Sequence, residues 1–186
     1  AARLLPAFRE RGLDVVMVFP SVIFGPGTET EGNHVARILR MVQEKKFPGL
    51  VGGGGQRWNL GYVDDIVEGH RLALESAPPG SAYVLGGEDC VLRDLLALAA
   101  PRLAVPTPKR VLGYGLCHFL AGLEEFKARL TGLPPQLTHG EVEIYRHDWV
   151  YSSARAEREL GYRVTPLLTA LERTIAWLRE TAEEAG

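Results

Sequence analysis

The sequence predicts an α/β protein built around a parallel sheet. Residues 15–19, VVMVF, form a continuous and largely β-branched apolar run without alternation, which is typical of a strand buried on both faces. A loop rich in proline and glycine follows this run, and a helical pattern follows the loop, so strand and helix signals alternate along the chain. The 186 residues are enough to bury one substantial core.

Helical signals lie on both sides of this strand. Residues 1–11 resemble the end of a helix, because their apolar side chains fall on one side and a glycine follows them. Residues 33–46 carry apolar side chains at helical spacing, which predicts a second helix. Asn33 is its expected N-cap, and Lys45 and Lys46 lie in the last turn, where positive charge complements the helix dipole.

A glycine run interrupts the pattern after this helix. Gly49, Gly52 and Gly55 satisfy the spacing G-x-x-G-x-x-G of dinucleotide-binding loops. That chemistry requires a strand before the glycines and a helix after them, where backbone N–H groups meet phosphate. Here a helix precedes the run and a strand-like stretch, residues 57–63, follows it. We therefore interpret the run as a flexible turn between helix and strand.

The second half of the chain alternates in the same way. The next helix is expected to begin at Asp65, with Glu68 completing a capping-box-like start. The last helix is expected to have Thr165 as its N-cap and Pro166 in its first turn. Its buried stripe comprises Leu167, Leu171, Ile175 and Leu178. Between them the sequence predicts a strand and turn at 82–87 and helices at 91–103, 110–132 and 154–161, the last of which Gly161 stops. It also predicts a short strand at 149–153.

Composition and charge exclude several classes of protein. The formal net charge is −2 with interspersed charges, so the sequence shows no footprint for nucleic acid or anionic lipid. Its apolar runs are shorter than the roughly 20 residues of a membrane span. Cys90 and Cys117 lie far apart and outside any C-x-x-C pair, which favours a reducing, cytoplasmic environment.

The sequence lacks the usual signatures of metal or hydrolase chemistry. None of the five histidines has a metal-ligand spacing to another histidine, a cysteine or an acidic residue, so no metal site is expected. Neither a G-x-S-x-G nucleophile elbow nor a phosphate-binding G-x-x-x-x-G-K-[ST] loop is present.

The order of short motifs resembles a known family. PSVIFGPG after the apolar strand, then GYVDDIVEGH, YVLGGED and ARAERELGY, resemble successive blocks of the extended short-chain dehydrogenases/reductases. Within them the chain is most similar to the dihydroflavonol-reductase-like branch of the NAD-dependent epimerase/dehydratase group. The resemblance implies the C-terminal part of a Rossmann-type parallel sheet with a small, mainly helical substrate domain. Residues 1–25 would end the coenzyme-binding domain, and residues 26–186 would form the substrate part, with returning Rossmann elements around 58–87 and 149–155.

The resemblance also implies a site. Pro20, Ser21, Val22 and Ile23 would contact the nicotinamide end of NAD or NADP, unless they form a plain strand-to-loop turn. The substrate side would include Phe24, Asn33, His34 and Val35, although Asn33 alternatively caps a helix and Val35 alternatively packs. Arg57 would bind an acidic group of the substrate or, equally, be a solvated turn arginine. We assign Asp64 and Asp65 to helix capping and loop anchoring.

Catalysis in this family requires a Tyr-x-x-x-Lys pair, whose tyrosine acts as the acid/base. None of the six tyrosines here is followed four residues later by lysine. The resemblance therefore places the catalytic pair and the coenzyme's glycine loop upstream of Ala1, and it places no catalytic residue within the chain.

Several functions remain open from the sequence. The first is reduction of a ketone or aldehyde; the second is epimerisation or dehydration of a nucleotide sugar. Trp58 beside Arg57 departs from the nucleotide-sugar pattern, which slightly favours a small carbonyl substrate. A third is a non-catalytic NAD(P)-binding or scaffold protein. A fourth is an interaction module built on residues 110–132, which would make the protein a homodimer.

Overall fold

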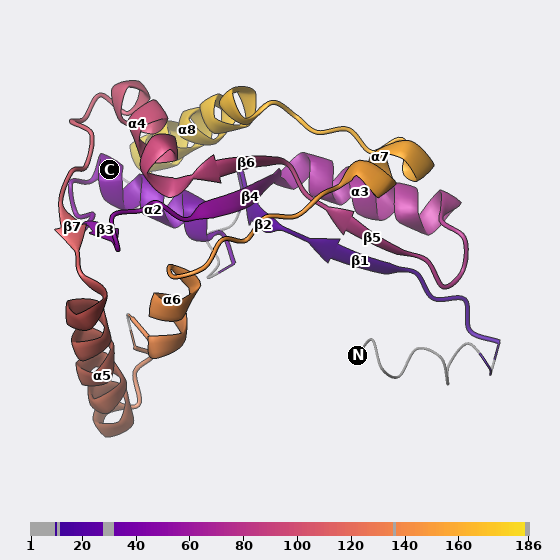
Figure 1. Ribbon diagram of the computed structural model, residues 1–186. Helices are drawn as coiled ribbons and strands as arrows, with labels where there is room; N and C mark the ends of the chain where they lie inside the picture. The colour runs from indigo at the N-terminus through magenta and orange to yellow at the C-terminus, as the bar shows by residue number, and fades with distance from the viewer. Residues whose placement is uncertain (1–9, 11, 28–31, 136, 185–186) are drawn as a thin grey trace. The chain divides into compact units, whose positions relative to one another are not determined.

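The computed structural model describes residues 10, 12–27, 32–135 and 137–184 (Figure 1). The helix predicted for residues 1–11 therefore lies almost wholly outside the described residues. Strands and helices alternate along the chain, as expected for an α/β protein. The chain divides into two compact units: unit 1 comprises Ala1–Arg37, Asn59–Asp89 and Tyr151–Gly186, and unit 2 comprises Ile38–Trp58 and Cys90–Val150.

Parallel strand pairs form the framework of unit 1. Strand β1 (Met17–Pro20) pairs in parallel with β5 (Ala82–Leu85), so the predicted strand exists, shifted slightly toward the C-terminus. Strand β2 (Val22–Phe24) pairs in parallel with β4 (Arg57–Tyr62). The carboxyl ends of paired strands therefore meet at common edges, as the predicted parallel sheet requires.

The expectation that residues 15–19 are buried on both faces is wrong. Phe19 is 48% exposed, and Pro20 is also exposed. Within the described residues β1 has β5 as its one strand neighbour, so the end of β1 lacks a second partner to cover it.

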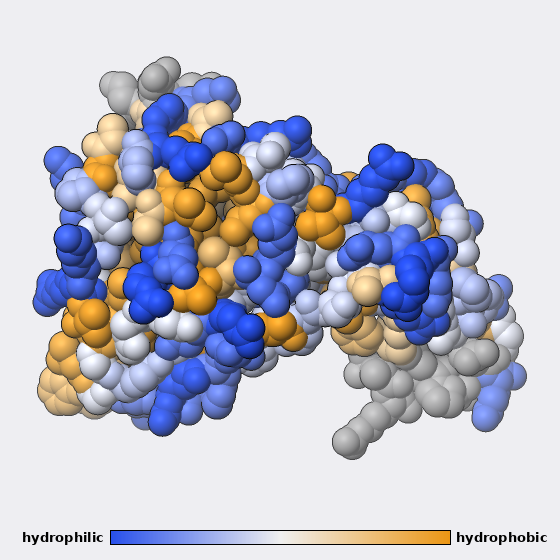
Figure 2. All heavy atoms as spheres, turned by 45° about the horizontal axis from the view of Figure 1, so that its top comes forward, coloured by the Kyte–Doolittle hydropathy of each residue, from blue (hydrophilic) through white to orange (hydrophobic). Residues whose placement is uncertain are grey.

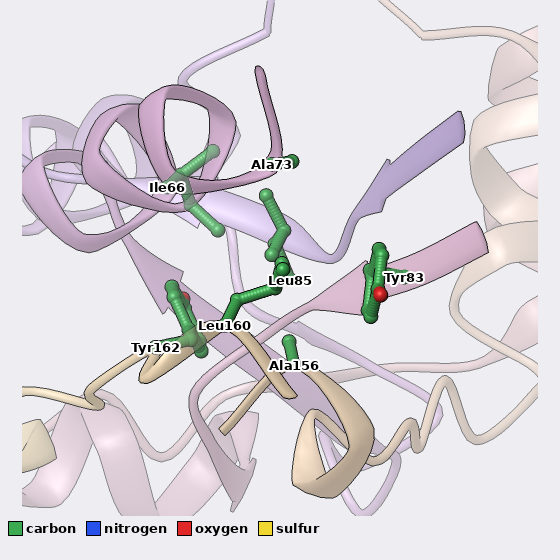
Figure 3. Close-up of a cluster of buried hydrophobic side chains, with 7 residues drawn as sticks. All are labelled: Ile66, Ala73, Tyr83, Leu85, Ala156, Leu160 and Tyr162. Carbon is green, nitrogen blue, oxygen red and sulfur yellow. The ribbon is translucent and has the colours of Figure 1, made fainter. Parts of the chain in front are cut away.

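The core of unit 1 lies between helices α3 (Val63–Ser76) and α7 (Ala154–Leu160) and strand β5 (Figure 3). Gly69 allows the close packing of α3 on this strand, because a Cβ atom there would lie 2.8 Å from a methyl group of Leu85. Gly161 ends α7 at a φ of 69°, as predicted from the sequence. The clustered side chains are Ile66, Ala73, Tyr83, Leu85, Ala156, Leu160 and Tyr162.

Helix α3 begins differently from the prediction. It starts at Val63, two residues before Asp65, and no side chain caps it. The carboxylate of Asp65 instead accepts hydrogen bonds from the backbone N–H and the hydroxyl of Thr165, each at 2.7 Å. The predicted capping box at Asp65 is therefore wrong, whereas the predicted loop-anchoring role is confirmed. Thr165 is the residue that Asp65 holds.

Helix α8 (Leu167–Glu184) has the predicted buried stripe. Leu171 is fully buried, and Leu167, Ile175 and Leu178 are at most 9% exposed. The apolar periodicity of the final helix is thus a correct guide to its buried face.

Helix α2 (His34–Gln43) matches the predicted element but not its ends. Lys45 and Lys46 lie beyond the last turn, and Lys45 has a positive φ of 58°. The Asn33 side chain donates a hydrogen bond to the carbonyl of Gly25 at 2.9 Å, while the Asn33 carbonyl accepts the Arg37 N–H. Asn33 therefore occupies the N-terminal boundary without capping it through its side chain.

The glycine run lies in unit 2 and does not lead into a helix. It contains the short strand β3 (Leu50–Val51), which pairs in parallel with β7 (Val111–Leu112), and it continues into β4. The carbonyl of Gly54 accepts the N–H of Arg93 at 3.0 Å. As expected, the run lacks the strand-to-helix order of a dinucleotide-binding loop, but it is a strand with a hydrogen-bonded turn rather than a flexible turn.

The remaining elements of unit 2 are mainly helical. Strand β6 (Glu88–Val91), which lies beside β4 in the order β2-β4-β6, leads into helix α4 (Leu92–Arg102). Helix α5 (Tyr114–Thr131) packs against the short helix α6 (His139–Ile144). The predicted strand at 149–153 is reduced to a single bridge between Trp149 and Trp58.

Helix α6 carries the capping box that the sequence analysis missed. The hydroxyl of Thr138 accepts the N–H of Glu141 at 3.1 Å, and the Glu141 carboxylate accepts the N–H of Thr138 at 2.9 Å. The motif Thr-x-x-Glu was present in the sequence, but no long apolar run follows it to draw attention to it. None of the described helices combines the length and the apolar character that crossing a membrane requires.

Candidate functional site

The four residues predicted to contact coenzyme lie at the carboxyl end of a parallel strand. Pro20 ends β1, Ser21 links β1 to β2, and Val22 and Ile23 belong to β2. The side chain of Pro20 is exposed, and the other three are partly buried. In α/β sheets, ligands bind at such carboxyl ends, because loops there can change without disturbing the core.

Ser21 places a hydroxyl group in a small space bordered by glycines. Its backbone N–H donates to the carbonyl of Leu85 at 2.9 Å. Its Oγ atom is buried and has no hydrogen-bond partner among the described residues. A Cβ atom on Gly61 would lie 3.0 Å from this oxygen, and one on Gly86 would lie 3.4 Å from it. The two glycines therefore allow the backbone to pack closely around an unsatisfied polar atom.

Asn59 on β4 links the segments around Gly87 and Tyr151 through hydrogen bonds, and its role was not predicted from the sequence. The side chain is 1% exposed; its amide donates to the carbonyl of Gly87 at 2.8 Å and to the carboxylate of Asp89 at 2.7 Å. The same amide lies 3.2 Å from the carbonyl of Tyr151, and its Oδ1 accepts the N–H of Gly87 at 3.0 Å. An isolated asparagine in an apolar strand, followed closely by glycine, is the signal that could have indicated this junction.

Gly87 must be a glycine for this junction to form. A Cβ atom there would overlap the backbone carbonyl oxygen of Leu60, which cannot move without distorting β4. The glycine pair at 86 and 87 therefore allows the chain after β5 to approach β4 closely, and this approach holds Ser21 and Asn59 beside each other.

The predicted substrate residues Phe24, Asn33, His34 and Val35 also lie in unit 1. Phe24 is buried and packs edge-on against Tyr62, with ring centroids 6.2 Å apart. Val35 is fully buried, which agrees with its alternative role in packing. The Oδ1 atom of Asn33 is buried and without a hydrogen-bond partner among the described residues. The Nδ1 atom of His34 lies 2.9 Å from the guanidinium of Arg37.

Arg57 belongs to unit 2 and already has an acidic partner. Its backbone N–H donates to the carboxylate of Asp148 at 2.8 Å, and its Nε lies 3.3 Å from the same carboxylate. The backbone hydrogen bond, more than the guanidinium, lowers the pKa of Asp148. Both side chains are about half exposed, so the pair contributes little to stability. The structure thus gives Arg57 an internal role in joining two segments of unit 2.

Two tyrosines of unit 1 are held in their neutral form. Burial raises the pKa of Tyr62, and the neighbouring Asp64 carboxylate adds to this effect, while Arg173 opposes it. Burial also raises the pKa of Tyr162, whose hydroxyl donates to the carbonyl of Gly86 at 2.9 Å. A catalytic acid/base tyrosine needs the opposite shift of its pKa.

Metal and disulfide chemistry find no support in the part of the chain that the structure describes. No group of three or more histidine, cysteine or acidic side chains is arranged to hold a metal ion there. Neither Cys90 nor Cys117 forms a disulfide among the described residues. The rings of His118 and His139 lie 5.4 Å apart, but His139 is engaged with Glu125 at 3.1 Å.

The protein is an α/β protein with parallel strands, flanking helices and a glycine-lined junction at the strand ends. Proteins of this class bind ligands at the carboxyl edge of the sheet. Residues 1–86 match the sequence pattern of the NAD dependent epimerase/dehydratase family. This match agrees with the resemblance to the extended short-chain dehydrogenases/reductases that the order of motifs predicts.

Individual relatives agree with this assignment. A protein of Synechocystis sp., provisionally named dihydroflavonol 4-reductase, is 29% identical over 178 residues, which cover 91% of this chain and 50% of the relative. The crystal structure of gox2253 aligns with a TM-score of 0.72 at 30% identity, over 96% of this chain and 53% of that one. The chain thus spans about half the length of the proteins that it matches.

A more distant structure shows the same fold. DesIV, a dTDP-glucose 4,6-dehydratase from Streptomyces venezuelae whose crystals contained NAD and TYD, aligns with a TM-score of 0.70 at 21% identity. The alignment covers 98% of this chain and 49% of DesIV.

Proposed function

We propose that the protein containing these residues is an NAD(P)-dependent oxidoreductase of the extended short-chain type that reduces a ketone or an aldehyde. The observation that carries the proposal is the position of Pro20–Ile23 at the carboxyl end of β1, next to a buried Ser21 hydroxyl without a partner. The family match supports the nicotinamide coenzyme, and the provisional name of the Synechocystis relative supports carbonyl reduction.

The residues at this edge fit a nicotinamide coenzyme. The exposed Pro20 offers a flat apolar surface, and Ser21 supplies a hydroxyl that can donate or accept one hydrogen bond. Pro20, Ser21, Val22 and Ile23 would hold the nicotinamide end of the bound coenzyme. When bound, the coenzyme would supply the hydride, while the protein would orient it and exclude water.

The substrate would lie beyond this edge, near Phe24, Asn33 and His34. The unpartnered Oδ1 of Asn33 is an acceptor for a substrate hydroxyl or amide, and His34 provides a second polar contact. Val35 would support these residues from the core rather than touch substrate. The proton donor would come from outside these 186 residues, since they contain no Tyr-x-x-x-Lys pair.

The contact between Arg57 and Asp148 favours a small carbonyl over a nucleotide sugar. An arginine that binds a diphosphate must offer its guanidinium to the ligand. Here the guanidinium already faces a carboxylate, and its neighbour Trp58 is buried. We retain a nucleotide-sugar epimerase or dehydratase as the second candidate, because the fold is shared with DesIV.

Coenzyme titration of the full-length protein tests the site. Ser21→Asp is expected to weaken binding of NADH or NADPH about tenfold or more, because it adds charge and bulk beside the proposed nicotinamide position. Ser81→Asp is the matched control, since Ser81 lies at the amino end of the same β1–β5 pair. Equal affinities of the two variants, with unchanged melting temperatures, would refute the site.

Product analysis separates the candidate functions. The full-length protein should oxidise NAD(P)H with a ketone or aldehyde and should leave UDP- and dTDP-sugars unchanged. Turnover of sugars, with a raised KM in Arg57→Ala, would favour the second candidate. Coenzyme binding without turnover, together with an upstream sequence that lacks Tyr-x-x-x-Lys, would instead identify a binding or scaffold protein.

A further inference from the structure

Helix α5 exposes a continuous row of large apolar side chains. Leu116 is 48% exposed, Phe119 65%, Leu123 50%, Phe126 60% and Leu130 73%. Apolar surface is visible at the lower left of Figure 2, on the side where Figure 1 draws α5. Soluble proteins seldom leave so many large apolar groups uncovered on one helix, so this face indicates an interaction site.

The spacing of the row is that of a coiled-coil seam. The five side chains follow one another at alternating intervals of three and four residues, which are the a and d positions of a heptad repeat. Leu120, 40% exposed, widens the seam on one side. A strict a/d stripe is narrow and fits another helix, whereas a helix that packs on a broad core needs a wider face.

The opposite side of α5 is already occupied within unit 2. Cys117 and Ala121 are buried there in a cluster with Leu112 and Val142. The carboxylate of Glu125 also accepts the backbone N–H of His139 at 2.9 Å. The helix is thus anchored by its small residues, and the exposed row points away from this anchor.

We propose that the exposed row of α5 binds the same row of a second copy of this protein, as an antiparallel helix pair around a two-fold axis. In this register Leu123 of one copy faces Phe126 of the other, and Phe119 faces Leu130. Each aromatic ring then meets a leucine, and the opposed helix dipoles attract. The surface is isologous, so one patch serves both copies.

Charge and area favour a second copy over a membrane surface. Helix α5 carries Glu124, Glu125, Lys127 and Arg129, so its charged residues balance. Helices that lie on anionic membranes carry an excess of basic residues on the polar face. The row exposes roughly 500 Å² of apolar surface, at about 100 Å² for each half-exposed leucine or phenylalanine. Two copies would bury about 1,000 Å², which is the lower limit for a specific interface.

Cysteine cross-linking of the full-length protein tests the pairing and its direction. Leu123→Cys and Phe126→Cys variants, mixed and mildly oxidised, should form a disulfide-linked dimer, whereas each variant alone should not. Wild-type protein under the same oxidation measures any background from Cys90 and Cys117. Leu98→Cys on α4 is the matched control, because Leu98 is 41% exposed in the same unit but outside the row.

Other results would overturn the proposal. Cross-linking of each variant with itself would indicate parallel pairing. No cross-link in the mixture, with unchanged melting temperatures, would show that a second copy does not cover the row. If wild-type protein then bound anionic phospholipid vesicles and Leu123→Asp did not, the partner would be a membrane surface. None of these outcomes depends on coenzyme binding, so the pairing can fail while the proposed function stands.

Discussion

Helices α5 and α8 are both 18 residues long, yet α8 buries leucine side chains that α5 exposes at comparable spacing. In α8 the side chains of Leu171 and Leu178 are buried in unit 1, with exposures of 0% and 1%. In α5 the large apolar side chains point outward, and only Cys117 and Ala121 are buried among the described residues of the helix. A leucine periodicity therefore identifies a stripe but does not say which molecule covers it.

The size of the buried residues explains the difference. The cysteine and alanine on the inner side of α5 are small, so the helix can approach α6 closely without large side chains between them. Helix α8 fills its side of the core with leucine and isoleucine, and its one fully buried threonine, Thr174, donates to the carbonyl of Ala170 at 2.7 Å. The polar group is thereby satisfied within the helix.

The largest expected effect compares the two helices directly. Leu171→Ala should lower the free energy of unfolding by about 2–5 kcal/mol, because it leaves a cavity in the core. Leu123→Ala should change it by less than about 0.5 kcal/mol at protein concentrations too low for association. Denaturant unfolding of the two full-length variants measures both. Similar losses in the two would mean that the row on α5 is a covered core surface.

The polar junction of unit 1 should come next in size. Asn59→Ala removes the side-chain hydrogen bonds to Gly87 and Asp89. The free energy of unfolding should therefore fall by about 1–3 kcal/mol. Ser81→Ala, which removes a single exposed hydrogen bond to Pro78, is the control and should change little. A small effect of Asn59→Ala would show that water replaces these bonds readily.

A smaller effect is expected where Asp65 anchors the segment before α8. Thr165→Val removes the hydroxyl donor but keeps the backbone N–H that Asp65 also accepts, so the loss should be about 1 kcal/mol. Asp64→Asn, on the exposed neighbour of Asp65, serves as the control. If both variants unfold alike, the anchoring by Asp65 contributes nothing specific to unit 1.

The smallest effect concerns the exposed carboxylate of unit 2. The pKa of Asp148 should lie below its ordinary value of 3.8. Arg57→Ala should remove only part of this shift, because the backbone N–H of residue 57 is its main cause. Since the folded pKa is lowered, the associated stability is present above the unfolded pKa and is lost as the pH falls through the folded one. NMR titration of the carboxyl carbon follows this directly. Complete reversion in Arg57→Ala would assign the shift to the guanidinium.

Most elements of the fold were predictable because their signals are local. The apolar run before Pro20 predicted a strand, and Gly161 predicted the end of α7. The buried side of α8 was predicted by the spacing of Leu167, Leu171, Ile175 and Leu178. The resemblance to the family followed from the order of four short motifs and is confirmed by the family match of residues 1–86. The proposed coenzyme and substrate residues rest on that resemblance and stay predictions.

Tertiary structure decided the features that depend on partners distant in the sequence. The two-residue strand β3 exists because β7 lies beside it, Asn59 is buried because residues 87–89 and 151 reach it, and Arg57 meets a carboxylate 91 positions away. Phe19 is exposed for the converse reason, since its strand lacks a second neighbour among the described residues. The sequence by itself determined most of the helices, the main strands and the family resemblance, because local spacing sets backbone propensity. Only the tertiary structure determined which apolar side chains stay uncovered, as on α5 and at Phe19, because burial depends on what packs against each face.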